Sequence, residues 1–133
     1  LNLLGDLKRR FGFTLILISH SLHAIRYLCS DISVLYKGRI VEEAPAAGFF
    51  LAPGHPYSRS LLAATPGMDS RWKNAIPAKD AATEDCGSGC AFRTDCPDRL
   101  PRCSERIPPL AATESGGKVA CHAYPPKPDP DDV

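Results

Sequence analysis

One short stretch decides the expected fold: residues 14–18 read Thr-Leu-Ile-Leu-Ile. A continuous run of β-branched and aliphatic residues of this length is typical of a strand buried on both faces, as in a parallel α/β sheet. Before it, residues 3–11 carry leucines and a phenylalanine at helical spacing, and Gly12 follows as a helix stop. Helix, turn and buried strand predict an α/β fold, and because no strand precedes the helix we expect the chain to begin inside a longer protein.

The residues that follow predict short helices and strands up to residue 66. They are a helix capped by Ser21, strands over residues 32–36 and 39–42, a short helix closing at residues 49–51, and a helix over residues 57–64 that begins after Pro56. Lys37-Gly38 between the two strands is a two-residue hairpin signal. From Gly67 onward the hydrophobic periodicity is lost, which predicts irregular structure.

Composition excludes several classes of protein. The 16 basic and 15 acidic residues leave a net charge of +1, which argues against a nucleic-acid partner. No apolar run approaches the roughly 20 residues that a membrane-spanning helix needs, and the first residues do not resemble a signal peptide. The cytoplasm is therefore the favoured compartment, where disulfides are not the default state of cysteines.

His20 lies two residues beyond the predicted buried strand. Ligands of open α/β sheets bind outside the carboxyl ends of the strands, where an imidazole can donate to a phosphate oxygen or position a water molecule. A solvated loop histidine is the alternative, and position alone favours that reading because one histidine after one strand is a weak motif.

Residues 17–22 (LISHSL) and 34–42 (VLYKGRIVE) together resemble the end of an ABC-transporter nucleotide-binding domain. The resemblance implies that His20 is the switch histidine that senses the γ-phosphate of ATP, with Mg²⁺ as the accompanying cation. Ser21 stands where the family usually has aspartate. The sequence contains no Gly-x-x-x-x-Gly-Lys-Ser/Thr loop, no ABC signature and no strand ending in an acidic pair, so this segment by itself is expected to be inactive.

Residues 55–66 (HPYSRSLLAATP) resemble the segment that marks the oligopeptide/dipeptide subfamily of these ATPases. From the residues themselves, Pro56 fixes the start of a helix, and Tyr57, Leu61 and Ala64 share one face that must pack against something. We interpret it as a structural docking helix, not as a catalytic element.

A cysteine cluster follows, with spacing Cys86-x3-Cys90-x5-Cys96-x6-Cys103-x17-Cys121. Zinc prefers Cys-x2–4-Cys pairs, which only the first two cysteines provide, whereas iron–sulfur clusters tolerate wider spacings. Spacing alone leaves zinc and iron–sulfur open.

Residues 89–96 (GCAFRTDC), Cys103 and residues 119–122 (VACH) look like the C-terminal extension of the peptide-importer ATPases, which binds a [4Fe–4S] cluster. That resemblance implies four ligands: Cys90, Cys96, Cys103 and Cys121. Cys86 is then a spare thiol, Cys29 a small buried hydrophobe, and His122 a less favoured competing ligand. A structural role for the cluster is preferred to electron transfer, because the segment is too poor in apolar residues to fold alone.

These readings predict an α/β fold in which the C-terminal remnant of a P-loop ABC ATPase domain precedes a small, irregular cysteine-rich extension. The predicted divisions are residues 1–43 (nucleotide-binding domain end), 44–66 (docking segment), 67–85 (linker), 86–123 (cysteine-rich extension) and 124–133 (disordered tail).

The family resemblance implies an ATP-binding subunit of a di- or oligopeptide importer, peripheral on the inner face of the cell membrane. Its implied partners are transmembrane permease subunits, a second ATP-binding subunit in a homo- or heterodimer, and a peptide-binding protein that acts through the permease. The alternative is a stand-alone metal-binding or regulatory module without an ATPase role.

Overall fold

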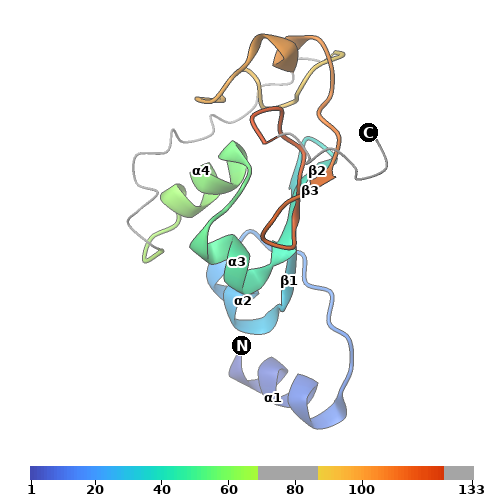
Figure 1. Cartoon of the computed structure of the whole chain (residues 1–133). Helices are drawn as coiled ribbons and strands as arrows, with labels where there is room; N and C mark the ends of the chain where they lie inside the picture. Colours follow the sequence, from blue (N-terminus) through green and yellow to red (C-terminus); the bar gives the residue numbers. More distant parts are fainter. Residues whose placement is uncertain (69–86, 125–133) are drawn as a thin grey trace, which may run out of the picture.

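The computed structural model describes residues 1–68 and 87–124, in which helices and short strands form an α/β fold around a small antiparallel sheet (Figure 1). The elements are α1 (Asn2–Phe11), α2 (Leu22–Leu28), β1 (Asp31–Tyr36), β2 (Arg39–Pro45), α3 (Ala46–Leu51), α4 (Pro56–Ala64), the 3₁₀ helix η2 (Pro101–Ser104), β3 (Ala111–Ala112) and β4 (Lys118–Val119). Cys86 and most of the predicted linker and tail lie outside the described residues. Within the described part, no helix has both the length and the apolarity needed to cross a lipid bilayer.

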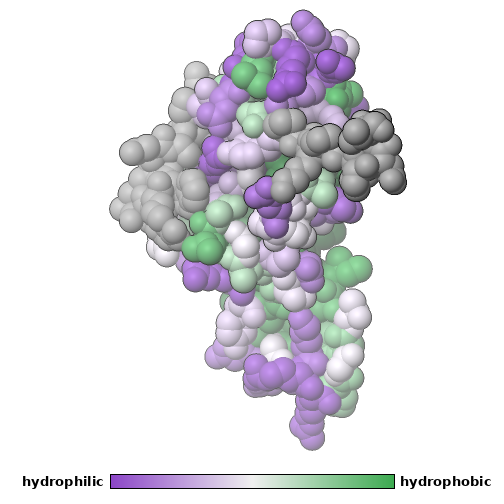
Figure 2. Space-filling view, viewed as in Figure 1, coloured by the Kyte–Doolittle hydropathy of each residue, from purple (hydrophilic) through white to green (hydrophobic). Residues whose placement is uncertain are grey.

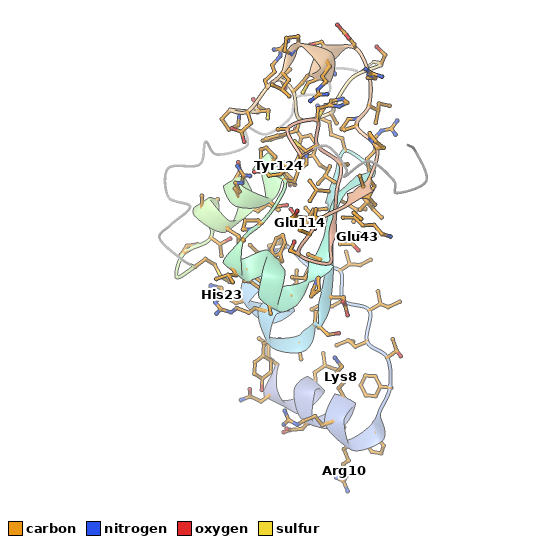
Figure 3. The ribbon with its side chains drawn as sticks, viewed as in Figure 1. Lys8, Arg10, His23, Glu43, Glu114 and Tyr124 are labelled. Atoms are coloured by element: carbon orange, nitrogen blue, oxygen red, sulfur yellow. The ribbon has the colours of Figure 1, made fainter. Side chains whose placement is uncertain are left out.

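Local signals set the ends of the first two helices as predicted. Gly12 ends α1 in the left-handed conformation, with φ of 65°, and its N–H donates to the Lys8 carbonyl. Ser21 caps α2, because its side chain accepts a hydrogen bond from the Ala24 N–H at 3.4 Å. The side chain of Lys8 donates to the Leu28 carbonyl at 2.9 Å, which connects α1 to the end of α2 (Figure 3).

The predicted hairpin is confirmed as the antiparallel pair β1 and β2. Lys37 and Gly38 both have positive φ, 46° and 76°, as expected for the turn type that matches the twist of paired strands. Alternate residues of β1 are buried, so its inward face carries Ile32, Val34 and Tyr36. The hairpin therefore presents one apolar face to the rest of the molecule.

The buried strand predicted over residues 14–18 is wrong for the described chain. Residues 12–19 form neither helix nor strand, and Ile16 and Ile18 are 86% and 96% exposed. A strand buried on both faces needs paired neighbours and covering helices, and within the described ranges no strand pairs with this segment. Figure 2 shows apolar surface at the lower right, where Figure 1 places the connection between α1 and α2.

The cysteine-rich segment contributes strands to the same sheet as the hairpin. The sheet order is β1-β2-β4-β3, with Glu42 of β2 opposite Val119 of β4 and every pairing antiparallel. The Ala120 N–H continues this edge by donating to the Val41 carbonyl at 2.9 Å. The end of the chain's described part is thus bonded directly to the hairpin.

One apolar core joins the hairpin, the His-Pro-Tyr segment and the cysteine-rich segment. Phe92 is 1% exposed and lies edge-on to Tyr36 at 5.4 Å between ring centroids, while Tyr57 lies 5.5 Å from Phe92. The Tyr36 and Tyr57 rings are themselves 4.5 Å apart. These aromatic contacts connect three segments that are distant in sequence, which makes Phe92 their common anchor.

Candidate functional site

His20 lies in the exposed bend directly before the N-cap of α2. The Ser21 N–H donates to the Ser19 side chain at 3.0 Å, which stabilises the backbone around the histidine. At the second residue of α2, His23 Nε2 lies 2.8 Å from the Pro66 carbonyl oxygen (Figure 3). The helix that begins beside His20 is therefore attached to the end of the His-Pro-Tyr segment.

The start of the His-Pro-Tyr segment is held by a buried carboxylate. Glu42 is 2% exposed, and its two oxygens accept from the Gly54 N–H at 2.7 Å and the His55 N–H at 2.9 Å. Gly54 also lies against Val119 so closely that a Cβ on it would come within 2.5 Å of Val119 Cγ2. Sequence reasoning missed Glu42, whose only signal was an acidic residue beside a buried valine in a strand.

His55 is the N-cap of α4, and it is 1% exposed. Its Nδ1 accepts the Tyr57 N–H at 3.0 Å, a role that requires Nδ1 to carry no proton. Burial first, and then the charge of Arg59, lower the pKa of His55 from 6.5 to about 4, against a hydrogen bond with the Ala120 backbone. The imidazole therefore caps α4 in its neutral form.

We expect this buried histidine to make stability depend on pH. Because the folded pKa lies below the unfolded value, the unfolded chain takes up a proton first as the pH falls from 6.5 towards about 4. Stability is thus greatest above pH 6.5 and falls below it, by up to about 3 kcal/mol from this group. Urea unfolding from about pH 7.5 down to about pH 4.5 should show a smaller loss in His55→Asn, which retains a capping oxygen. Equal losses in both proteins would contradict the prediction.

The four predicted cysteine ligands gather at the end of the sheet that carries the hairpin turn. Cys90, Cys103 and Cys121 are buried and Cys96 is half-buried, and none of the four is in a disulfide. The Cys90 N–H donates to the Cys103 carbonyl at 2.7 Å. A Cβ on Gly89 would lie 2.5 Å from that carbonyl oxygen, so this close crossing of two chain segments requires glycine.

Three of these thiols accept backbone hydrogen bonds. The Leu100 N–H lies 3.4 Å from Cys103 Sγ, and the backbone of Asp98 and Ala123 bonds to Cys96 and Cys121. Burial raises the pKa of Cys96 to about 11 and also raises that of Cys121. Charge on Cys90 and Cys121 adds to the raised pKa of Cys96, and charge on Cys90 and Cys103 adds to that of Cys121.

Two further contacts stabilise the backbone beside these cysteines. The Arg102 side chain donates to the His122 carbonyl at 2.8 Å, and His122 Nε2 lies 2.9 Å from the Arg106 carbonyl. His122 is thus engaged with the backbone. In the part of the chain that the structure describes, no three cysteine, histidine or acidic side chains lie close enough together to hold a single metal ion.

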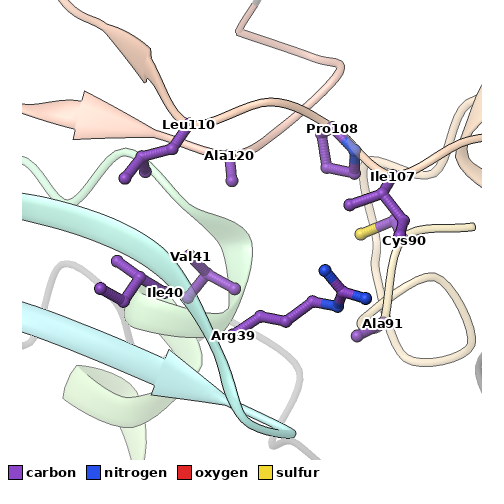
Figure 4. A pocket seen from close by; sticks show the side chains of 9 residues that line it. All are labelled: Arg39, Ile40, Val41, Cys90, Ala91, Ile107, Pro108, Leu110 and Ala120. Carbon is purple, nitrogen blue, oxygen red and sulfur yellow. The ribbon is translucent and has the colours of Figure 1, made fainter.

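A cavity of about 370 Å³ opens beside Cys90, between β2 and the cysteine-rich segment (Figure 4). Apolar side chains form most of its lining, and Arg39 reaches across it from the hairpin (Figure 4). Its lining comprises Arg39, Ile40, Val41, Cys90, Ala91, Ile107, Pro108, Leu110 and Ala120. Cys90 is the one of the four predicted ligands that lines this cavity.

Comparison with known proteins agrees with this arrangement. Residues 41–103, which include most of the hairpin's second strand, the His-Pro-Tyr segment and three of the four predicted cysteine ligands, match the family model "Oligopeptide/dipeptide transporter, C-terminal region". A probable peptide ABC transporter ATP-binding protein of Sinorhizobium fredii is 40% identical over 129 residues, which cover 95% of this chain and 36% of that protein.

Two other relatives show similar identity and coverage. A putative peptide import ATP-binding protein of Brucella ovis is 40% identical over 90% of this chain and 39% of its own length. A putative oligopeptide transport ATP-binding protein of Bacillus subtilis is 34% identical over 92% of this chain and 39% of its own length. The chain thus spans less than two-fifths of the length of these relatives.

Nearly the whole chain is thus similar to peptide-transport ATP-binding proteins, and residues 41–103 match the C-terminal region of the oligopeptide/dipeptide transporter family.

Proposed function

We propose that this chain is the C-terminal part of a subunit that couples ATP hydrolysis to the uptake of di- or oligopeptides across the cytoplasmic membrane. The observation that carries the proposal is the similarity of nearly the whole chain to peptide-transport ATP-binding proteins. The attachment of the His-Pro-Tyr segment by Glu42 and His23 gives the family's marker segment a defined place beside α2.

In this proposal His20 is the residue of the chain that meets the nucleotide. Its exposed position at the start of a capped helix leaves the imidazole free to approach the γ-phosphate of an ATP molecule held with Mg²⁺ by other parts of the subunit. Because α2 is attached to Pro66 through His23, a shift of the helix on ATP binding would be passed to the His-Pro-Tyr segment.

The proposed partners follow from the same family. They are transmembrane permease subunits, a second ATP-binding subunit, and a peptide-binding protein that contacts the permease, with this subunit on the inner face of the membrane. The chain's nearly balanced charge agrees with partners that are proteins and not nucleic acids.

We further propose that Cys90, Cys96, Cys103 and Cys121 hold a [4Fe–4S] cluster. The donor chemistry fits, because four thiols without disulfides gather in a buried site and three of them accept backbone N–H groups. Once bound, the cluster supplies a covalent link among the four chain segments that carry the cysteines.

The resemblance to the peptide-importer extension, and not the thiol spacing, favours the cluster over zinc. A single zinc ion draws four sulfurs to about 2.3 Å from one centre, whereas an iron–sulfur core places each thiolate on a different iron atom. Among the described residues no three cysteine, histidine or acidic side chains lie close enough together to hold a metal ion, so this geometry does not distinguish zinc from the cluster. The buried thiols also need a cationic partner to ionise, and a metal centre provides it.

Peptide uptake tests the transport function. A strain that lacks the gene should lose uptake of labelled di- and oligopeptides, and the intact gene should restore it. His20→Ala should fail to restore uptake although the subunit still binds ATP, because the γ-phosphate contact is lost. Arg10→Ala, which changes an exposed side chain of α1 that has no role in this proposal, is the control and should restore most uptake. Normal uptake in the deletion strain would exclude the function, and normal uptake with His20→Ala would exclude the role of His20.

A further inference from the structure

Arg59 of α4 connects the His-Pro-Tyr segment to the cysteine-rich segment. Its side chain donates to the Pro53 carbonyl at 3.3 Å and the Gly54 carbonyl at 3.2 Å, both within the loop that precedes its own helix. The same guanidinium donates to Asp98 Oδ2 at 3.0 Å and lies 5.2 Å from the centre of the Tyr124 ring. Arg59 thus contacts the loop before α4 and also contacts Asp98 and Tyr124 of the cysteine-rich segment.

Asp98 and Tyr124 are close in the chain to two of the predicted ligands, Cys96 and Cys121. The Asp98 backbone N–H bonds to Cys96, and the Ala123 backbone bonds to Cys121. The Tyr124 N–H donates to the Cys121 carbonyl at 3.0 Å, and Figure 3 shows Tyr124 beside the start of α4. Holding Asp98 and Tyr124 in place therefore also orients the Cys96 and Cys121 side chains.

Charge provides a second connection. Asp98 follows Cys96 by two residues in the chain, so its carboxylate places a negative charge beside that proposed ligand. Arg59 forms an ion pair with this carboxylate, and its side chain is 22% exposed while that of Asp98 is 41% exposed. The guanidinium therefore offsets a negative charge that would otherwise oppose thiolates at this place.

We propose that Arg59 is a positioning residue for the four-thiol site, which it serves by orienting Cys96 and Cys121 and by balancing the charge of Asp98. The consequence for cluster chemistry rests on the proposed function, whereas the orientation of the two cysteines does not. The His-Pro-Tyr helix is then part of the support of the metal site as well as a docking element.

The midpoint potential of the cluster tests the charge effect in the complete subunit, purified without oxygen. Reduction adds a negative charge, so Arg59→Gln should lower the potential and Asp98→Asn should raise it. The double variant should return towards the wild-type value, and Arg59→Lys, which retains the charge, should stay near it. A purely structural role would not produce opposite shifts that cancel. Identical potentials in all variants would overturn the charge effect.

The rate of iron release to a chelator tests the positioning effect. Arg59→Gln and Arg59→Lys should both release iron about tenfold faster, because neither side chain reproduces the planar fork that reaches Pro53, Gly54 and Asp98. Arg99→Gln is the matched control, because it removes a neighbouring exposed arginine whose side chain bonds to Ser104. Unchanged release in both Arg59 variants would overturn the positioning role.

Hydrogen exchange separates this inference from the proposed cluster. If the wild-type subunit contains no iron and sulfide, the cluster proposal fails, but the amides of Asp98 and Ala123 still report on Arg59. In metal-free protein, Arg59→Gln should speed exchange at both amides by about tenfold relative to wild type and Arg99→Gln. Equal exchange in all three proteins would overturn the inference in either case.

Discussion

Replacing Cys103 by serine is expected to prevent binding of the proposed [4Fe–4S] cluster altogether. The thiol is 5% exposed and accepts the Leu100 N–H, while its carbonyl accepts the Cys90 N–H. A serine hydroxyl is a poor ligand for iron, and the closely packed backbone around Gly89 leaves little freedom for another ligand to move in. The variant should therefore lose iron and sulfide together.

Metal and sulfide analysis of the complete subunit, purified without oxygen, measures this outcome. The wild type should contain about four iron and four sulfide per chain, and Cys103→Ser should contain less than about one of each. Cys29→Ser is the matched control, because this free, partly exposed thiol follows α2 and is not among the proposed ligands. A colourless wild type with one zinc would exclude the cluster, and full iron content in Cys103→Ser would exclude this ligand.

Local rules were sufficient for the elements whose signals lie within a few residues. Gly12 ends a helix because its left-handed conformation is available without strain, and Ser21 begins one because its hydroxyl reaches the Ala24 N–H. Lys37-Gly38 forms the predicted turn for the same kind of reason. Such features depend on covalent geometry and short-range hydrogen bonds, so they can be predicted from sequence.

Features that depend on distant partners were predicted poorly. The apolar run at residues 14–18 has the composition of a buried strand, but composition does not supply the neighbouring strands that would pair with it. Strands β3 and β4 have two residues each, too few for any periodic signal, and they are defined only by their pairing across the sheet. Glu42 becomes a binding residue only because the chain returns to place Gly54 and His55 beside it.

The candidate site residues also fall into those that the sequence could indicate and those that only distant contacts define. The cysteines were found from spacing and from resemblance to a family, and the structure places all four at one end of the sheet. Their assignment as cluster ligands and the role of His20 remain predictions, as do the proposed boundaries between segments. Arg59 carried no sequence signal, because its importance comes from contacts with Asp98 and Tyr124, which lie far along the chain.

Phe92 lies where the hairpin, the His-Pro-Tyr segment and the cysteine-rich segment meet, so Phe92→Ala should be among the most destabilising single changes. The ring is 1% exposed and contacts Tyr36 and Tyr57, and His55 lies 5.8 Å away between ring centroids. Truncation removes the buried apolar surface and leaves a cavity that the three anchored segments have little freedom to fill. We expect a loss of about 3–5 kcal/mol in the free energy of unfolding.

Urea unfolding of the complete subunit, followed by a probe within this region, measures the loss. Phe92→Leu should lose less, because it retains part of the packing and remains measurable if the alanine variant does not fold. Phe11→Ala is the matched control: this ring is 68% exposed, so its removal should change stability by less than about 0.5 kcal/mol. Since Phe92 touches all three segments, its truncation should also speed hydrogen exchange in the hairpin, which has no cysteine ligands. Faster exchange confined to the cysteine-rich segment would mean that the three segments do not share a core. The same conclusion would follow if Phe92→Ala lowered the free energy of unfolding no more than Phe11→Ala does.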